Sequence, residues 1–471
     1  MIPAGVIEPG GDLATLLYIV SFSLFIFGIR RGTHPTTARQ GNLIAAVGMA
    51  IAVVTTLLLD GIGNWGLIIL GLAIGTAVGV VASLKVQMTQ MPQMVALYNG
   101  MGGGAAGAIA AVELLRQNAV HETVPLILAV LGAVIGSISL SGSLIAWAKL
   151  DGRINGTWRF SGQQIVNGVL FLATLAVGAY IVFIAHGHAS PAIVAAFFGG
   201  ALVFGVLMTM PIGGADMPVV ISLYNAFTGL AVGFEGYVLQ NPALMIAGMV
   251  VGSAGTLLTL LMAKAMNRSV SNVIFSNFGA SGDDQQGEIK GTQKPAEASD
   301  AAIQMRYANK VIIAPGYGLA VAQAQHKLYE FVKLLVDAGV EVKFAIHPVA
   351  GRMPGHMNVL LAEAGVPYDM IYDLEDINDE FKEADVAIVI GANDTVNPAA
   401  RTNKSSPIYG MPILNVDQAK QVYIVKRGQG KGYSGVENEL FYADNANLVY
   451  GDAQKVMIAM IQAVKSLEGG H

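Results

Sequence analysis

A glycine-rich turn at residues 316–321 is the stretch of this sequence best suited to binding a phosphate-bearing ligand. It reads GYGLAV, a Gly-x-Gly-x-x-Val pattern, and follows a short apolar run at residues 311–314. Apolar residues at three- and four-residue spacing from Val321 to Val336 predict one helix, which Gly339 would end. A glycine turn between a strand and a helix lets backbone approach a pyrophosphate. The pattern therefore predicts a nucleotide-binding βαβ unit.

The groups that would choose between NAD and NADP are basic. An NAD-binding unit usually carries Asp or Glu about 20 residues after the glycines. Residues 341–348, EVKFAIHP, are predicted as the second strand, and no acid stands at its end. Arg352 follows it, and Lys426-Arg427 ends a later strand, QVYIVKR. Basic groups favour a 2′-phosphate and hence NADP. The alternative for Lys426-Arg427, a solvated strand end, is outweighed by the glycine-rich loop GQGKGY that follows.

An acidic loop after another predicted strand supplies a further candidate. The apolar runs DVAIVIGA and MPILNV predict two more strands, so this part reads as a Rossmann-like α/β domain with a doubly wound parallel sheet. Ligands bind beyond the carboxyl ends of such strands, where GANDTVNPAA lies. Asp394 in that loop is either a helix cap or a titrating group that senses the cofactor. Both interpretations remain open.

The charged residues divide the chain into two regimes. Of 471 residues, 54% are hydrophobic and 13% charged, against about 25% charged in soluble proteins. Residues 1–268 hold 18 of the 59 Lys, Arg, Asp and Glu. We predict a membrane domain at 1–268, a linker at 269–305 and a cytosolic domain at 306–471. The net charge of −5 argues against nucleic acid, and the absence of Cys excludes disulfides, thiolate metal sites and cysteine nucleophiles.

Nine apolar segments are long enough to cross a lipid bilayer, which takes roughly 20 residues. They lie at about 11–29, 42–59, 65–86, 92–114, 124–148, 164–186, 191–212, 217–239 and 242–266. Nine of the ten Lys and Arg of residues 1–268 fall on one set of alternate loops. The positive-inside rule assigns those loops to the cytosol, so the N-terminus lies outside and the C-terminal domain inside.

Two similar stretches place an Asn near the middle of the fourth and eighth spans. MPQMVALYNGMGG contains Asn99 and MPVVISLYNAFTG contains Asn225. Spans three to five and seven to nine form a weak parallel repeat, and sites tend to lie between such repeats. Each Asn could simply bond neighbouring helices. Their equivalent depth favours a polar pathway lined by the pair.

Two carboxylates in this region carry different expectations. Asp216 precedes the eighth span, where it marks either an ion path or a helix start. Glu235 lies near the outer end of the same span and is predicted to be interfacial.

Several long motifs resemble the proton-translocating nicotinamide nucleotide transhydrogenases. APGYGLAVAQAQ, IHPVAGRMPGHMNVLLAEA, VIGANDTVNPAA and KRGQGKGYSGVEN resemble the NADP(H)-binding domain of this family. GGADMPVVISLYN and AKAMNRS resemble its membrane domain. The likeness covers nearly the whole chain and is closest to the bacterial beta subunits.

The resemblance implies Re/Si-specific hydride transfer between NADH and NADP⁺, driven by protons entering the cytosol across a bacterial inner membrane. It places NADP(H) on this chain and NAD(H) on a separate alpha subunit, in a dimer of heteromers. No residue acts as a catalytic acid or base, because hydride transfer needs only positioning. It also implies roles for individual residues: Gly316, Gly318 and Val321 cradle the pyrophosphate, Lys426 and Arg427 hold the 2′-phosphate, Arg352 and Tyr433 enclose the cofactor, and Asp394 couples protonation to NADP(H) affinity.

The proton path departs from the family at one position. Some members carry a His where Asn99 stands, and that His is proposed to carry the proton. Asn does not titrate near neutral pH, so a water wire or a His on another chain must serve. Asp216 and Asn225 match family positions along the channel.

Two alternatives to the enzyme are a channel or transporter gated by a nucleotide-sensing domain, and a module with a structural nucleotide. The basic pair and the long motifs argue against both.

Overall fold

The computed structural model describes residues 7–8, 10–116, 122–154, 158–213, 216–275, 291–406, 408–428, 432 and 434–468. The chain divides into two compact units. Met1–Ile212 and Val220–Thr259 form the first unit, and Gly213–Val219 and Leu260–His471 form the second. Each unit is described by itself below.

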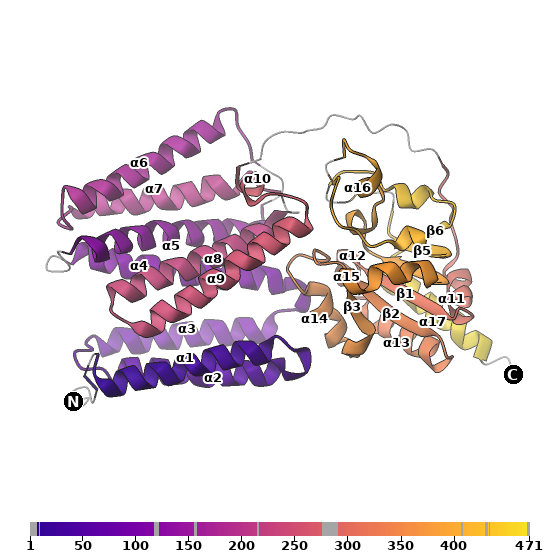
Figure 1. The fold of residues 1–471 in the computed structure, drawn as a ribbon, viewed down its shortest axis with the longest axis horizontal. Helices are drawn as coiled ribbons and strands as arrows, with labels where there is room; N and C mark the ends of the chain where they lie inside the picture. Colours follow the sequence, from indigo (N-terminus) through magenta and orange to yellow (C-terminus); the bar gives the residue numbers. More distant parts are fainter. Residues whose placement is uncertain are drawn as a thin grey trace. The chain divides into compact units, whose positions relative to one another are not determined.

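Nine helices within the described residues are long and apolar enough to cross a membrane, as predicted (Figure 1). Their bounds are α1 Asp12–Gly32, α2 Pro35–Leu57, α3 Trp65–Lys85, α4 Met91–Leu115, α5 Thr123–Leu150, α6 Gln163–Phe183, α7 Pro191–Thr209, α8 Met217–Val238 and α9 Pro242–Ala265. The start of α2 lies at Pro35, before the predicted residue 42. A proline at the first helical position is preset for the helix, so helix formation begins before the apolar run.

Glycines allow close contact in two of the helical hairpins. A Cβ on Gly103 of α4 would lie 3.0 Å from the carbonyl oxygen of Gly136 on α5. A Cβ on Gly229 of α8 would lie 2.3 Å from the backbone nitrogen of Gly252 on α9. Gly103 and Gly229 are equivalent in the two similar stretches that contain Asn99 and Asn225. Both hairpins therefore use small residues to bring helix backbones together, which is how helices associate in lipid.

The second unit contains a six-stranded parallel sheet in the order β3-β2-β1-β4-β5-β6. The strands are β1 Lys310–Pro315, β2 Glu341–Ile346, β3 Ile371–Asp373, β4 Val386–Ile390, β5 Gln421–Lys426 and β6 Ala446–Tyr450. The strands run outward from the centre in two halves, β1 to β3 on one side and β4 to β6 on the other. This order confirms the predicted doubly wound, Rossmann-like fold. It also makes the carboxyl ends of the adjacent central strands β1 and β4 neighbours.

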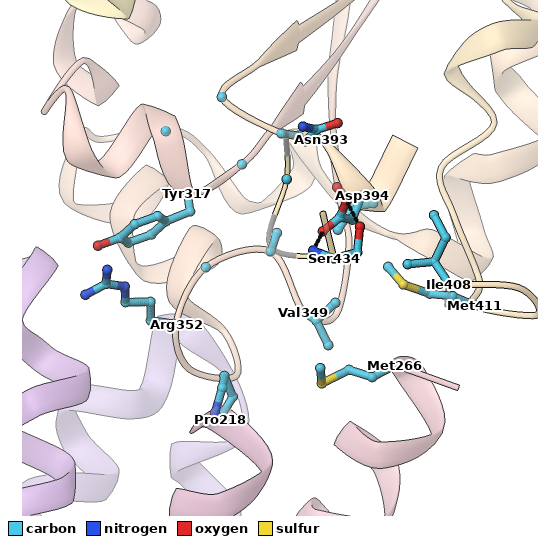
Figure 2. A pocket seen from close by; sticks show the side chains of 18 of the residues that line it. Pro218, Met266, Tyr317, Val349, Arg352, Asn393, Asp394, Ile408, Met411 and Ser434 are labelled. Carbon is cyan, nitrogen blue, oxygen red and sulfur yellow. Dashed lines mark hydrogen bonds between the residues drawn. The ribbon is translucent and has the colours of Figure 1, made fainter. Parts of the chain in front are cut away.

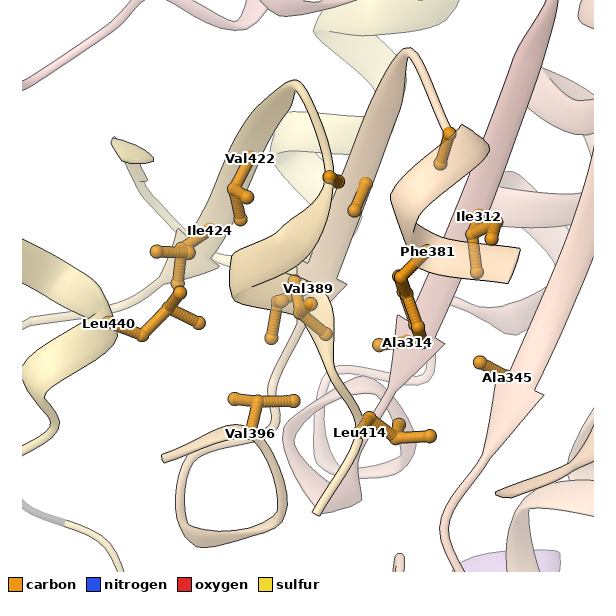
Figure 3. Close-up of a cluster of buried hydrophobic side chains, with 14 of the residues drawn as sticks. Ile312, Ala314, Ala345, Phe381, Val389, Val396, Leu414, Val422, Ile424 and Leu440 are labelled. Carbon is orange, nitrogen blue, oxygen red and sulfur yellow. The ribbon is translucent and has the colours of Figure 1, made fainter. Parts of the chain in front are cut away.

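Both faces of the sheet are buried. One face packs Ile312, Ala314 and Val389 against Phe381, Leu414 and other side chains of the segments that cover it (Figure 3). Val311 and Ile313, which alternate with these residues along β1, are fully buried on the opposite face. The longest helices of this unit are α13 Gln325–Asp337 and α17 Ala453–Glu468, which pack against each other and against strands. Burial on two faces explains why the strands are continuous apolar runs.

The helix predicted from Val321 to Val336 is confirmed over Gln325–Asp337, but it does not extend back to Val321 as one helix. A short helix, α12 Tyr317–Val321, ends after the glycine turn, and α13 starts at Gln325. Gln323 between them has a φ of +51°. A residue in the left-handed region cannot continue a right-handed helix, so the chain breaks there and restarts. Gly339, with a φ of +86°, follows the end of α13 as predicted.

The predicted strand MPILNV is also wrong. Residues 411–415 have no ladder pairing: Leu414 donates its amide to the carbonyl of Thr395, and Asn415 donates to the side chain of Asn378. Ile413 and Leu414 are buried because this segment lies against the hydrophobic core. Apolar composition here reports burial rather than strand pairing. Strands β3 and β6, in contrast, were not predicted.

The range 269–305, predicted as a linker, contains ordered structure at both described ends. Helix α10 spans Val270–Phe275, and residues 276–290 lie outside the described residues. Helix α11, Ala298–Arg306, buries Ala301, Ala302 and Met305 and packs on α17. The packed part of the α/β fold therefore begins before residue 306.

Candidate functional site

The glycine turn after β1 packs against the turn after β4. A Cβ on Gly316 would lie 2.5 Å from the Cα of Ala392, and one on Gly318 would lie 2.6 Å from the Cα of Gly391. These distances are shorter than real carbon contacts, so both positions require glycine. Gly391 itself has a φ of +68°, which also favours glycine. The two turns therefore form one tight wall at the carboxyl ends of β1 and β4.

The backbone amides of Gly316 and Gly318 already donate hydrogen bonds within the protein. Gly316 donates its N–H to the carbonyl of Ile390, and Gly318 donates to the carbonyl of Gly391, each at 2.9 Å. The two glycines thus serve the close approach of two backbones in this structure. Beside the two turns lies a pocket whose lining includes Gly316, Gly318, Arg352, Asp394 and Ser434. Val321, at the end of α12, is exposed and does not line this pocket.

Asp394 lies beside these two turns and forms hydrogen bonds with the loop that contains Ser434. Its carboxylate accepts hydrogen bonds from the hydroxyl of Ser434 at 2.7 Å and from the amide of Ser434 at 3.0 Å (Figure 2). A Cβ on Gly432 would lie 2.3 Å from the same carboxylate. The side chain of Asp394 does not cap its own short helix, which begins after Asn393 without a side-chain cap. It instead links the loop after β4 to the loop after β5.

Arg352, in the loop that follows β2, also lines this pocket. Its guanidinium is 4.4 Å from the centre of the Tyr317 ring, a cation–π distance (Figure 2). Its backbone amide donates to Nδ1 of His356 at 3.1 Å. Burial lowers the pKa of His356, and the charge of Arg352 lowers it further. A neutral His356 can accept this bond, and so helps to fix the Arg352 loop.

The end of β2 lacks an acid, as the sequence predicted. His347 stands there, with Nε2 2.7 Å from the carbonyl oxygen of Pro412 and Nδ1 accepting from the amide of Val349. Burial lowers the pKa of His347 to about 4. The imidazole is therefore neutral and structural, and it holds the start of the Arg352 loop against the 411–415 segment.

The basic pair lies at the end of β5. Lys426 Nζ is 4.1 Å from the centre of the Phe441 ring, and burial lowers the pKa of Lys426. Arg427 is exposed. Neither is among the described residues that line the pocket beside Asp394 and Arg352. Tyr433 lies outside the described residues.

A polar cluster surrounds Asn99 in the helical unit. Asn99 Nδ2 donates to the hydroxyl of Ser143 at 3.0 Å and lies 3.5 Å from that of Ser139. The hydroxyls of Ser139 and Thr228 are 2.6 Å apart, and Thr228 donates to the carbonyl of Asn99 at 3.3 Å. Helices α4, α5 and α8 each contribute to this cluster. Asn99, Ser139, Ser143 and Thr228 thus each have a hydrogen-bond partner on another of these helices.

Asn225 and Asp216 are not among the hydrogen-bond partners of Asn99. Asn225 is half-buried, and none of the hydrogen bonds of Asn99 reaches it. Thr228, three residues later on α8, is the residue that meets Asn99. Asp216, directly before α8, has its Oδ2 3.3 Å from Arg268 Nη1.

The prediction that Glu235 is interfacial is wrong. Its side chain is fully buried within the helical unit. The carboxylate lies against Gly132 of α5, where a Cβ would be 2.2 Å from Oε1. The sequence marks Gly132 only as one small residue among many, so the space it leaves is visible only in three dimensions.

Comparison with known proteins identifies the family of this chain. Residues 14–463 match the model of the NAD(P) transhydrogenase beta subunit. Two proteins named NAD(P) transhydrogenase subunit beta, both from Rhodospirillum rubrum, are 48% identical over 475 residues, which cover 96% of this chain and 99% of each relative. The chain belongs to the NAD(P) transhydrogenase beta subunit family. It is therefore a membrane component of an NAD(P)(H)-using enzyme, and a beta subunit implies an alpha subunit as its partner.

Some residues of these sites were predicted from sequence motifs, and others were found only in the structure. Gly316, Gly318, Arg352 and Asp394 were predicted and line one pocket. Ser434, Tyr317, Ser139, Ser143 and Thr228 were missed as site residues. The serine-rich run SISLSGS inside an apolar span was the signal for two of them, whereas Tyr317 and Ser434 carried no signal beyond their glycine-rich neighbours.

Proposed function

We propose that this chain is the NADP(H)-binding and membrane subunit of a proton-translocating transhydrogenase. It would act with a separate alpha subunit that binds NAD(H), and couple Re/Si-specific hydride transfer between NADH and NADP⁺ to proton movement into the cytosol. The observation that carries this proposal is the pocket at the carboxyl ends of β1 and β4, walled by Gly316 and Gly318 and lined by Arg352, Asp394 and Ser434. Ligands of doubly wound sheets bind at this edge.

The residues present fit NADP(H) better than NAD(H). The end of β2 carries a buried, neutral His347 in place of the acid that would bond a free ribose hydroxyl. Arg352, Lys426 and Arg427 provide positive charge for phosphates. In the proposal, Lys426 and Arg427 hold the 2′-phosphate, Arg352 and Tyr433 enclose the cofactor, and Gly316, Gly318 and Val321 shape the pyrophosphate site. The bound cofactor supplies the hydride chemistry at its nicotinamide ring.

The work of the protein is then positioning and gating. Two nicotinamides must be held in near-attack contact and kept from water, which requires no catalytic acid or base on this chain. Asp394 is the proposed coupling residue, because its carboxylate holds the 434 loop at the edge of the pocket. A change of charge on Asp394 would alter that link and so alter cofactor exchange.

The membrane unit is the proposed proton path. Asn99 supports this role through its cluster with Ser139, Ser143 and Thr228. We assign Asp216, directly before α8, and Asn225 on α8 to the same path. We further infer a bacterial inner membrane location, with the N-terminus in the periplasm and the NADP(H) domain in the cytosol. The distribution of basic residues supports this orientation. The complex would be a dimer of alpha–beta heteromers, which its native mass would test.

Sealed vesicles that contain this chain and its alpha subunit test the proposal. NADP⁺ reduction by NADH should be detectable, and a proton gradient directed toward the cytosolic side should raise its rate. Collapse of the gradient with an uncoupler is the control. The proposal would be dropped if NADP(H) binds but no hydride exchange occurs with any NAD(H)-binding partner.

A further inference from the structure

Glu235 is a fully buried carboxylate on α8 that none of the roles above uses. Among the described residues, neither of its oxygens has a hydrogen-bond partner. Removing a carboxylate from water without partners costs several kcal/mol, so apolar packing alone would not retain it. Ionisable groups inside membrane spans mark paths for ions or protons by default.

The residues around Glu235 leave room for its carboxyl group and bring few other charges to it. Gly132 of α5 faces it without a side chain. On α4, Glu113 is close enough to interact electrostatically with Glu235, and Arg116 lies 3.7 Å from Glu113. On α9, the described residues carry no titratable side chain before Lys264 at the far end of the helix.

Glu235 lies in line with the polar cluster of Asn99. Thr228 precedes it by seven residues on α8, which is two helical turns, or about 10 Å. On α5, Gly132 and Ser139 are also seven residues apart. The interface of α5 and α8 therefore brings Glu235 against Gly132 at one level and Thr228 against Ser139 two turns away.

We propose that Glu235 is the proton-accepting side chain at the outer end of this path. Its carboxylate takes a proton from water on the outer side and releases it through intervening water toward Thr228, Ser139 and Asn99, returning to its starting form. This supplies the titratable group that Asn99 cannot provide. The proposal rests on the proposed function, since it assumes that protons cross this unit.

The test is Glu235→Gln in the complete complex in sealed vesicles, with Glu122→Gln as the matched control. Glu122 is exposed and precedes α5. We expect Glu235→Gln to bind NADP(H) as the wild type does but to lose at least tenfold in gradient-driven NADP⁺ reduction, while Glu122→Gln stays at the wild-type rate. Wild-type coupling in Glu235→Gln overturns this inference, whereas a lack of coupling in the wild type overturns the proposed function instead.

A second variant is needed in case the complex with Glu235→Gln does not assemble. Glu235→Asp keeps a titratable group on a shorter side chain, so coupling should persist with a displaced pH profile; an unchanged pH profile overturns the proposal. If neither variant assembles, infrared spectroscopy of the wild-type complex decides. A carboxyl carbonyl band that changes with pH is expected, and the absence of any such band overturns the proposal.

Discussion

Ser434 donates two hydrogen bonds to Asp394, at 2.7 Å from its hydroxyl and 3.0 Å from its amide. The two residues are 40 positions apart and belong to loops after different strands of the sheet. Ser434 also accepts the amide of Val436 at 3.1 Å, so its hydroxyl fixes its own loop as well. One carboxylate thereby connects two loops at the carboxyl edge of the sheet, where a ligand would enter.

Removal of the Ser434 hydroxyl should loosen this connection. Hydrogen bonds to charged groups contribute about 1.5–3 kcal/mol, so Ser434→Ala should raise the open population of the loop by tenfold or more. Hydrogen exchange at Val436 and its neighbours measures this opening. Ser405→Ala is the control, because the Ser405 hydroxyl bonds Asn403 in an exposed loop. Unchanged exchange in Ser434→Ala would show that the link does not hold the loop.

Loss of the charge at the end of β5 should weaken NADP(H) binding. In the proposed role, Lys426→Ala removes a charge-assisted bond to the 2′-phosphate, and the Kd for NADPH should rise tenfold or more. Binding of NAD(H) to the alpha subunit should not change. Isothermal titration of the complex measures both. Lys382→Ala, an exposed lysine paired with Asp379, is the control; equal affinities for the two variants would remove Lys426 from this role.

Addition of one methyl group at Gly318 should destabilise the α/β fold. A Cβ there meets the Cα of Gly391 at 2.6 Å, and overpacking of this kind costs about 1–3 kcal/mol. Gly318→Ala should therefore lower the midpoint of thermal unfolding. Gly428→Ala is the matched control, because a Cβ at Gly428 meets no atom within 4 Å. Equal unfolding temperatures of the two variants would show that the close contact of Gly318 with Gly391 does not exclude a side chain.

The buried His347 should make the α/β fold sensitive to moderate acid. Burial lowers its pKa from 6.5 to about 4, so between these values the unfolded state binds the proton and the folded state does not. Its contribution therefore falls as pH drops below 6.5, by roughly 3 kcal/mol at pH 4. His347→Gln cannot titrate and should lose less stability between pH 7 and pH 5, measured by thermal unfolding. His326→Gln, exposed on α13, is the control. Equal pH dependence of His347→Gln and the wild type would contradict this account.

Replacement of Asn99 should break the polar cluster between the membrane helices. Asn99→Leu removes the donor to Ser143 and Ser139 and leaves their hydroxyls without it. In the proposed role, gradient-driven NADP⁺ reduction should fall tenfold or more while the complex still assembles. Val95→Leu is the control, since Val95 lies one turn earlier on α4 and is exposed. If Asn99→Leu retains full coupling, the cluster is packing rather than a pathway.

The sequence predicts the elements more reliably than the contacts between them. Each span was found because crossing a bilayer requires a fixed apolar length, which is a local property. The strands β1, β2, β4 and β5 were found because burial on both faces makes them apolar throughout. The same rule wrongly predicted a strand at residues 411–415. This segment packs against the hydrophobic core, and such packing also requires apolar side chains.

Residues brought together from distant positions could not be predicted. The sequence by itself determined nine spans, a doubly wound sheet, the glycine turn and an Asn at mid-span. Only the tertiary structure decided that Gly318 faces Gly391, that Asp394 bonds Ser434, that Asn99 meets Thr228 rather than Asn225, and that Glu235 is buried against Gly132. The physical reason is that composition and spacing act along the chain, whereas hydrogen bonds and close packing depend on which side chains the fold brings within a few ångströms.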